Sequence, residues 1–236
     1  MRFNFHIQKR LSSNSRVFDL DVRLNTDSQR IVILGESGSG KSLTLKAIAG
    51  LITPDAGHIE LGNQTLFNKT KRINQAPQQR HLAYLFQDYA LFPHLNVRQN
   101  IAFGLVRGWF NPQGKNKDAK VEYWLDAFQL QAVAHQLPHE LSGGQKQRTA
   151  LARALISQPA ALLLDEPFAA LDPALRIVMR KELDALQRSL KVPMILITHD
   201  PDDAEVFGEQ VMSMHDGRLY EDPQCENEAL VMADVA

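Results

Sequence analysis

The chain has 236 residues, enough for one large domain or two small ones, and a 44% hydrophobic content that can bury a substantial core. A net charge of −1 at pH 7 gives no reason to expect a nucleic-acid partner. The single cysteine, Cys225, excludes an internal disulfide framework and a cysteine-rich metal site. No apolar run approaches the ~18 residues that span a bilayer, and the start, MRFNFHIQKR, lacks the apolar stretch of a signal peptide. We therefore expect a soluble, cytoplasmic protein whose membrane role, if any, comes through a partner.

The first part of the chain predicts strands on both sides of a Gly-rich loop. Residues 3–7 and 18–24 alternate apolar and polar side chains, which is typical of two half-buried strands, paired antiparallel. Residues 30–34, RIVIL, form an apolar run typical of a buried central strand. The loop at 35–42 leads into a helix with an apolar face of Leu45, Ile48, Ala49 and Leu51. Further along we expect strands at 58–61 and 81–86, and a polar loop at 69–80.

The later part alternates helices with buried strands. Residues 88–158 have a helical pattern, interrupted by an exposed connection at 107–120. Buried strands are predicted at 161–164 and 194–198, a helix at 175–190 between them, and a strand pair at 210–214 and 217–220. The last stretch, 221–236, is acidic and weakly patterned. This alternation indicates an α/β domain with a mainly parallel sheet, and the block at 88–158 reads as an inserted helical subdomain.

The segment GESGSGKS fits the phosphate-binding pattern G-x-x-x-x-G-K-[ST] at every position. Its glycines let successive backbone N–H groups face an anion, and the helix that follows adds partial positive charge. Lys41 is expected to reach the β- and γ-phosphates, and Ser42 to offer a hydroxyl to Mg²⁺. The expected ATP-binding residues here are Gly35, Glu36, Ser37, Gly38, Ser39, Gly40, Lys41, Ser42 and Leu43.

The strand ALLLDE ends in two carboxylates. Asp165 is expected to hold Mg²⁺, directly or through water. Glu166 is the next residue and is expected to position or deprotonate the attacking water. The alternative is an acidic strand end exposed to solvent, which the nearby phosphate loop disfavours.

The segment LSGGQ is a second possible anion-binding helix start in the same chain. One nucleotide does not need two such cradles, so the second is expected to serve the nucleotide of a neighbouring subunit. The expected contacts are Ser142, Gly143, Gly144 and Gln145. The alternative is a loop followed by an ordinary capped helix.

Three single residues complete the predicted site. His199 follows the strand MILIT and is expected to contact the γ-phosphate and orient the attacking water. Gln87 ends the strand HLAYLF and is expected to touch Mg²⁺ or water, or else to be only a polar strand end. Asp172 is expected to cap the helix from Pro173, to cross a dimer interface, or both.

These motifs together resemble the ATP-binding cassette (ABC) ATPases, from the N-terminus to about Tyr220. The resemblance implies a P-loop NTPase, RecA-like core with an antiparallel β subdomain (1–87 and 159–220) and a helical subdomain (88–158), followed by the tail 221–236. It also implies ATP and Mg²⁺ as ligands, Glu166 as catalytic base and His199 as the switch histidine. Finally, it implies a head-to-tail homodimer, with each ATP between one subunit's phosphate loop and the other's LSGGQ.

One departure concerns adenine, which the family usually stacks on an aromatic residue near the N-terminus. The matching region, about residues 9–16, has no aromatic side chain. We expect weak stacking, or a contact from Leu11 or an arginine.

The segment FQDYALFPHLNVRQNIAFGL, within 86–105, resembles the ATPase subunits of binding-protein-dependent importers. It implies that residues 87–105 contact membrane permease subunits at the cytoplasmic face of the cell membrane, and indirectly serve a solute-binding protein. The candidates for the permease groove are Tyr89, Leu91, Phe92 and Pro93. The overall likeness favours molybdate importers; sulfate, ferric iron, thiamine and polyamine stay open as alternatives.

Other ATP- or GTP-dependent classes fit less well. A GTPase needs N-K-x-D, but Asn116-Lys117-Asp118 puts the Asp one position early. A P-loop kinase has no use for LSGGQ, and chromosome ATPases need long heptad repeats that are absent. A cytosolic, non-transport ABC ATPase stays open, as does a catalytically inactive binding module, which the intact Lys41, Glu166 and His199 disfavour.

Overall fold

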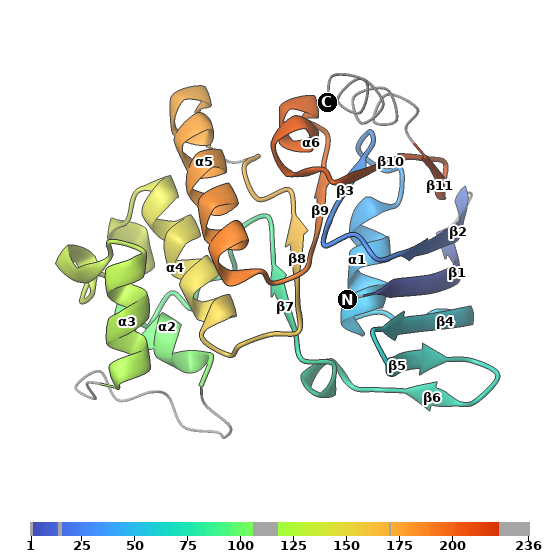
Figure 1. Ribbon diagram of the computed structural model, residues 1–236, viewed down its shortest axis with the longest axis horizontal. Coiled ribbons are helices and arrows are strands. Elements are labelled where there is room, and N and C mark those ends of the chain that lie inside the picture. Colours follow the sequence, from blue (N-terminus) through green and yellow to red (C-terminus); the bar gives the residue numbers. More distant parts are fainter. Residues whose placement is uncertain (1, 14–15, 106–117, 170, 222–236) are drawn as a thin grey trace, which may run out of the picture. The chain divides into compact units, whose positions relative to one another are not determined.

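The structure is a computed structural model that describes residues 2–13, 16–105, 118–169 and 171–221 (Figure 1). Two expected segments, most of the exposed connection at 107–120 and the acidic tail, lie outside the described residues. Contacts between Cα atoms divide the chain into two compact units, Met1–Leu82 with Lys191–Ala236, and Ala83–Leu190. The sequence-based division at residues 87 and 158 stays a prediction.

An antiparallel sheet in the first unit has the strand order β2-β1-β4-β5-β6. Alternate side chains of its first strands are buried, Phe3, Phe5 and Ile7 among them, so one face packs into a core. The predicted antiparallel pair is confirmed, with Ile7 opposite Val22. The strands are β1 (Phe3–Ser13), β2 (Arg16–Thr26), β4 (Ala56–Leu61), β5 (Gln64–Asn68) and β6 (Ile73–Asn74).

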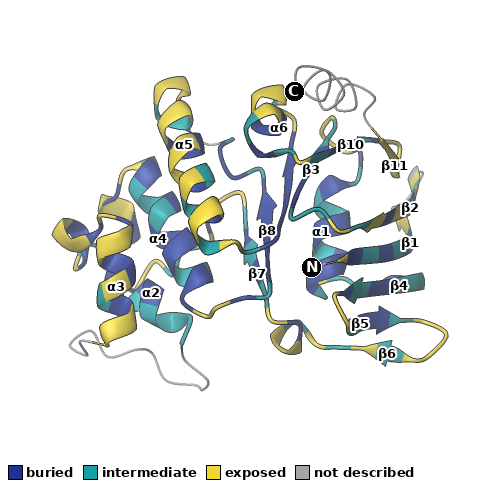
Figure 2. Cartoon of the chain, viewed as in Figure 1, coloured by how far each residue is buried: buried dark blue, intermediate teal, exposed yellow. Residues whose placement is uncertain are grey.

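The first unit also contains the adjacent strands β11-β10-β3-β9 of a second sheet. They are β3 (Arg30–Leu34), β9 (Met194–Thr198), β10 (Gln210–His215) and β11 (Arg218–Glu221). Strand β3 is parallel to both β9 and β10, and β11 is antiparallel to β10. Figure 2 colours β9 as buried throughout, as its unbroken apolar sequence predicts. Two helices follow strands of this sheet, α1 (Lys41–Ala49) and α6 (Pro201–Phe207).

The second unit holds most of the predicted helical block. Its strands are β7 (Leu82–Leu85) and β8 (Ala161–Asp165), and its helices are α2 (Val97–Phe103), α3 (Ala119–Ala127), α4 (Gly143–Leu155) and α5 (Pro173–Leu190). The apolar stripe of α3 is buried as its spacing predicts, at Val121, Trp124 and Leu125. The predicted α/β P-loop fold with helices inserted between its strands is confirmed.

Some local predictions were wrong. Leu51 does not continue the buried face of α1: the helix ends at Gly50, whose φ of 81° is left-handed, and Leu51 is 47% exposed. Residues 69–80 are not a simple polar loop. They contain β6 and a 3₁₀ turn (Pro77–Gln79), and they end in Arg80, whose side chain is fully buried.

Arg80 is buried because its guanidinium satisfies the end of α1. Nη1 donates to the carbonyl oxygens of Ala47 at 2.9 Å and Ile48 at 2.7 Å. Nε donates to the carbonyl of Gln75 at 3.0 Å. A Cβ on Gly50 would lie 2.6 Å from Arg80 Nε, so the glycine also makes room for the cation. Burial lowers the pKa of the Arg80 guanidinium, and the last carbonyls of α1 stabilise its positive charge.

We predict that Arg80→Met lowers the free energy of unfolding by about 3 kcal/mol, because two buried helix carbonyls lose a charged donor. Urea unfolding followed by circular dichroism measures this. Arg72→Met is the matched control, since Arg72 lies in the same segment and is exposed. Equal unfolding midpoints for the two variants would contradict the capping role of Arg80.

Candidate nucleotide-binding site

The loop at residues 35–42 connects the end of β3 to the start of α1. The N–H of Ser39 donates to the carbonyl of Glu36 at 3.2 Å, which closes a turn, and the first residue of α1 is Lys41. The Lys41 side chain is 4% exposed, and its Nζ donates to the carbonyl oxygens of Gly35 at 2.6 Å and Glu36 at 2.8 Å. The ammonium therefore lies across the mouth of its own loop, within reach of an anion bound there.

The outer part of this loop is open and its inner part is buried. Glu36, Ser37 and Gly38 are exposed. Ser39 is 8% exposed, and its buried Oγ makes no hydrogen bond to the described residues. A hydroxyl left without an acceptor at the start of a helix suits a phosphate oxygen as its partner.

Gly40 needs to be glycine for two reasons. Its φ is 108°, which side chains disfavour, and a Cβ there would lie 3.0 Å from Phe18 Cζ and 2.9 Å from Leu20 Cδ1. The aromatic ring of Phe18 thus comes next to the phosphate loop. Phe18 lies just outside residues 9–16, where an aromatic residue for adenine was expected. The alternating pattern assigned it only to a strand, so the sequence did not predict it as an adenine contact.

Strand pairing places Phe18 beside Leu11, which the sequence analysis named as a possible adenine contact. Phe18 lies directly opposite Leu11 across the β1–β2 ladder, so the two side chains share a face of the sheet. Phe18 is half-buried and Leu11 is 42% exposed. Together they offer an apolar surface beside Gly40.

His199 begins where β9 ends, in the same unit as the phosphate loop. Leu34 pairs with Thr198 in parallel register, and the N–H of Gly35 donates to the Thr198 carbonyl at 3.3 Å. The carboxyl ends of the two strands therefore bring residues 35–42 and His199 to the same sheet edge. The His199 side chain is exposed.

A buried hydrogen-bond pair fixes the chain around His199. Thr198 Oγ1 donates to Asp203 Oδ2 at 2.5 Å, and the N–H of Asp200 donates to Thr198 Oγ1 at 3.0 Å. Asp203 is 2% exposed, and Asp200 caps α6 through the N–H of Asp202 at 3.1 Å. The backbone before and after His199 is thus fixed, while its imidazole is accessible.

The two carboxylates at the end of β8 differ in their surroundings. Asp165 is 6% exposed, and Tyr84 Oη donates to its Oδ2 at 2.6 Å. Burial, with the neighbouring carboxylate, raises the pKa of Tyr84 far above its ordinary value, so the phenol stays a donor at physiological pH. Glu166 is half-buried and has a left-handed φ of 46°, a conformation that turns its side chain away from the strand's alternation. No sequence pattern marks the role of Tyr84 beyond its place on β7.

The LSGGQ segment starts α4 as a capping box. The N–H of Gln145 donates to Ser142 Oγ at 3.3 Å, and the N–H of Ser142 donates to Gln145 Oε1 at 2.9 Å. A Cβ on Gly143 would lie 3.1 Å from Leu171 Cδ2, which places the segment next to the residues after Glu166. Asp172 is exposed and caps α5 by accepting from the N–H of Leu175 at 3.0 Å, as predicted.

The predicted permease groove is only partly exposed. Gln87 and Pro93 are exposed, whereas Tyr89 is 5% exposed and packs inside the unit. Phe92 is half-buried, with its ring 4.2 Å from that of Phe103. A pocket of about 190 Å³ opens beside this segment, lined by Asp88, Tyr89, Leu91, Pro138, His139 and Lys146.

The structure thus groups the predicted residues within each unit. Residues 35–43 and His199 share a sheet edge in the first unit. In the second unit, residues 142–145 lie near Leu171, the residue before Asp172. In the same unit, Asp165 accepts a hydrogen bond from Tyr84 of β7. Their individual roles toward a nucleotide stay predictions.

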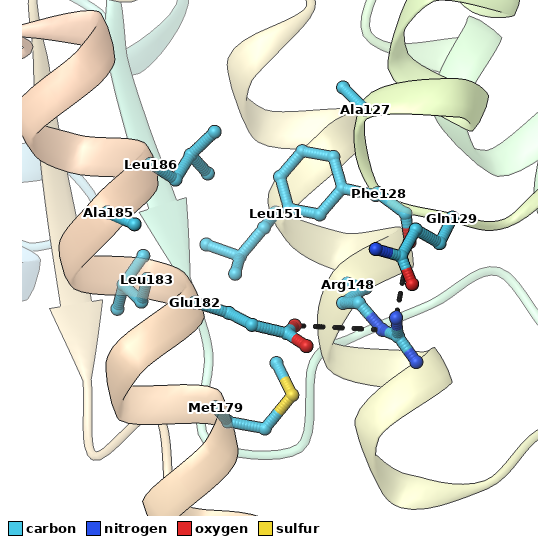
Figure 3. A pocket seen from close by; sticks show the side chains of 10 residues that line it. All are labelled: Ala127, Phe128, Gln129, Arg148, Leu151, Met179, Glu182, Leu183, Ala185 and Leu186. Carbon is cyan, nitrogen blue, oxygen red and sulfur yellow. Dashed lines mark hydrogen bonds and ion pairs between the residues drawn. The ribbon is translucent and has the colours of Figure 1, made fainter.

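A larger pocket, of about 270 Å³, lies among α3, α4 and α5 (Figure 3). Its apolar lining includes Phe128, Leu151 and Leu186, and Arg148 faces Glu182 with 4.0 Å between Nε and Oε2. None of its lining residues belongs to the predicted ATP site.

Among the described residues, no helix combines the length and apolar character needed to cross a membrane.

Solved structures share this fold. The dimeric structure of MJ0796, described as a bacterial ABC transporter cassette, superposes with a TM-score of 0.76 at 26% identity, covering 93% of this chain and 97% of that one. A second dimeric structure of the same cassette, in a post-hydrolysis state bound to ADP and Pi, gives 0.76 at 27% identity over the same shares of the two chains.

Curated relatives carry import functions in their names. The chain is 46% identical over 193 residues to the Fe(3+) ions import ATP-binding protein FbpC of Pseudomonas fluorescens, covering 81% of this chain and 53% of that protein. It is 42% identical to the sulfate/thiosulfate import ATP-binding protein CysA of Synechococcus elongatus, covering 90% and 59%. It is 40% identical to the spermidine/putrescine import ATP-binding protein PotA of Shigella dysenteriae, covering 92% and 55%.

The chain spans little more than half the length of these relatives. The family model described as ABC transporter matches residues 18–169, from β2 through the loop, LSGGQ and the β8 carboxylates. With relatives at least 40% identical over most of its length, the chain belongs to the ABC transporter family, as an ATP-binding cassette.

Proposed function

We propose that the chain is the ATP-hydrolysing subunit of a binding-protein-dependent importer, acting as a homodimer on membrane permease subunits. The observation that carries the proposal is the phosphate loop of residues 35–42, with Lys41 at the start of α1 and His199 at the neighbouring strand end. The import functions named for relatives that are 40 to 46% identical support the transport role.

ATP binding begins with the phosphates. The first N–H groups of α1 and the ammonium of Lys41 supply positive charge at one point, and Lys41 exchanges its bonds to Gly35 and Glu36 for phosphate oxygens. The buried hydroxyl of Ser39 gains an acceptor in the same step. Ser42, the second residue of α1, would offer its hydroxyl to the metal in this proposal.

The residues of the chain fit a magnesium ion held mainly by phosphate. Among the described residues there is no group of three or more His, Cys, Asp or Glu that would cage a metal. Mg²⁺ in nucleotide sites needs only one or two protein ligands, and here Ser42, Asp165 and Gln87 are the candidates. When bound, it neutralises charge that develops on the phosphates. The hydrogen bond from Tyr84 to Oδ2 orients the Asp165 carboxylate, the group proposed to face the ion or its water.

Hydrolysis transfers the γ-phosphoryl group to water. Glu166 accepts a proton from, or orients, the attacking water, and its left-handed backbone re-aims the carboxylate that follows Asp165. His199 contacts the γ-phosphate from a fixed backbone and an accessible side chain. The products are ADP and inorganic phosphate.

A second copy of the chain supplies the remaining contacts in this proposal. The Ser142 cap presents the N-terminus of α4 toward the partner's γ-phosphate, with Gly143, Gly144 and Gln145, and Asp172 lies at the dimer interface. The dimeric structures of MJ0796, one of them bound to ADP and Pi, support this arrangement.

Adenine binding is proposed for the surface of Phe18 and Leu11. The Phe18 ring lies so close to Gly40 that a Cβ there would come within 3.0 Å of its Cζ, so a base next to the loop would meet the ring. This adds an aromatic ring to the expectation of weak stacking or a contact from Leu11 or an arginine.

The identity of the transported solute is less well defined than the role of the chain as an ATP-hydrolysing subunit. The relatives above are named for iron, sulfate or thiosulfate, and spermidine or putrescine. They give no support to molybdate, the expectation from the overall likeness, and they favour its alternatives. Their import functions also favour an importer over a cytosolic non-transport ATPase. In the proposal the chain acts at the cytoplasmic face of the cell membrane, and a solute-binding protein serves the same importer.

The importer role predicts that the tagged chain, purified from detergent-solubilised membranes of its host, brings an integral membrane permease with it. Mass spectrometry identifies the co-purified proteins. Leu91→Asp, in the segment 87–105, should lose the permease while retaining ATP binding, because a charge enters the proposed groove. Recovery of soluble partners alone would favour the cytosolic assembly ATPase.

The proposed role of Tyr84 predicts that Tyr84→Phe weakens metal binding by about tenfold, because Asp165 loses the donor that orients it. Mn²⁺ binding measured by electron paramagnetic resonance in the presence of ADP reports this without turnover. Tyr220→Phe is the control, since Tyr220 is 51% exposed on β11. Unchanged Mn²⁺ affinity in Tyr84→Phe would exclude the orienting role.

The proposed adenine surface predicts that Phe18→Ala weakens ATP binding by about tenfold, since one base–aromatic stack contributes ~1–3 kcal/mol. Binding of inorganic tripolyphosphate, which has no base, should stay the same, and Phe18→Trp should restore ATP affinity. Val17→Ala, at an exposed neighbouring position on β2, is the matched control. Equal losses for ATP and tripolyphosphate would mean that Phe18 supports the loop rather than the base.

A further inference from the structure

The turn that follows Gln87 has an unusual backbone. Tyr89 has a φ of 63° and Ala90 a φ of 41°, so two consecutive non-glycine residues are left-handed. Such conformations are costly and persist only where the surroundings hold them. The N–H of Tyr89 donates to the Phe86 carbonyl at 2.9 Å and the N–H of Ala90 to Asp88 Oδ1 at 3.2 Å, but neither bond engages the carbonyl groups of these two residues.

Arg153 supplies the missing restraint. Its Nη2 donates to the Tyr89 carbonyl at 2.8 Å and its Nη1 to the Ala90 carbonyl at 2.7 Å. The same guanidinium lies over the ring of Phe92, 5.4 Å from its centroid. One planar, charged guanidinium therefore hydrogen-bonds to both left-handed residues and stacks over the aromatic side chain of Phe92.

Arg153 belongs to the last turn of α4, the helix that Ser142 and Gln145 cap at its other end. A helix of 13 residues packs as a stiff rod, so a shift at its first turn moves its last turn as well. Close packing ties this end of α4 to α2: a Cβ on Gly104 would lie 2.5 Å from the Arg153 carbonyl oxygen.

The buried side chain of Asn100 fixes the far side of the same loop. Asn100 of α2 accepts from the N–H of Phe92 at 2.9 Å and donates to the Leu95 carbonyl at 2.8 Å. The loop is thus held at Tyr89–Ala90 from α4 and at Phe92–Leu95 from α2. Of these two sets of hydrogen bonds, only the one to Tyr89 and Ala90 comes from α4, the helix that starts with LSGGQ.

We propose that Arg153 is a positioning residue that transmits movement of the LSGGQ helix to the loop after Gln87, by holding Tyr89 and Ala90 in their left-handed conformations. The proposal rests on the proposed function, in which LSGGQ meets ATP and residues 87–105 meet the permease. Arg153 touches neither ATP nor the reacting atoms in this account. Its loss should leave nucleotide binding and dimer formation unchanged while the loop ceases to respond to ATP.

The test follows amide hydrogen exchange by mass spectrometry in a peptide covering residues 88–96, with and without ATP and Mg²⁺. The Glu166→Gln variant is the parent, because loss of the proposed base should leave ATP binding intact and stop turnover. Adding ATP to this parent should change exchange in the peptide by about tenfold, as expected for a local opening that ATP closes or opens. In the double variant Glu166→Gln with Arg153→Met, the chain should still dimerise with ATP, but the ATP-dependent change should be lost.

Two further variants separate transmission from a loss of folding. Arg153→Lys keeps the charge but cannot form the two-pronged grip, so it should behave like Arg153→Met. Adding Ala90→Gly should partly restore the ATP response to Arg153→Met, since glycine adopts a φ of about 41° without strain and needs less restraint. Arg188→Met, on the exposed side of α5 where Arg188 pairs with Asp184, is the control and should match the parent.

The outcomes are distinct. An ATP response retained in the Arg153→Met double variant, or absent from the parent although it dimerises, would overturn the inference and leave the proposed function intact. If the parent does not dimerise with ATP, the result would contradict the proposed function and, with it, the inference. Unfolding of both Arg153→Met and Arg153→Lys would make Arg153 a structural residue, which also contradicts the inference.

Discussion

The guanidinium of Arg80, buried under the last turn of α1, fixes the helix on which the phosphate loop depends. The loop has to present its backbone N–H groups and Lys41 to an anion, so the first turn of α1 cannot be filled by protein partners of its own. Stability must therefore come from the other end, where Arg80 bonds to the carbonyls of Ala47 and Ile48. The negative end of the helix stabilises the buried cation in return.

Arginines recur at the equivalent point of two other elements. Arg30 donates to the carbonyls of Phe207 at 3.1 Å and Val206 at 2.7 Å, at the end of α6, the helix that follows His199. Arg153 lies in the last turn of α4 and bonds to a neighbouring loop. For α1 and α6 the guanidinium bonds to the last carbonyls of the helix, whereas Arg153 extends from the last turn of α4 to loop carbonyls.

The sequence predicts this site well where the chemistry requires contiguous residues. The loop at 35–42, the carboxylates Asp165 and Glu166, and the LSGGQ helix start each depend on neighbours in the chain, so spacing alone reveals them. It fails where the partner is distant in sequence. Phe18 reaches Gly40 through the register of β1 and β2, and Arg80 reaches α1 from a segment whose polarity suggested an exposed loop. Tyr84 likewise meets Asp165 only through folding, 81 residues apart, and no local pattern marks it.

ATP is proposed to lie between two copies of this chain, and the mass of the Glu166→Gln variant in solution tests this arrangement. Size-exclusion chromatography with light scattering should give about 26.6 kDa without nucleotide and twice that mass with ATP and Mg²⁺. The dimer should disappear when Ser142→Arg is added, because a bulky cation replaces the cap that faces the partner's phosphate. A chain that binds ATP with full stoichiometry yet stays at the mass of one copy would contradict the account.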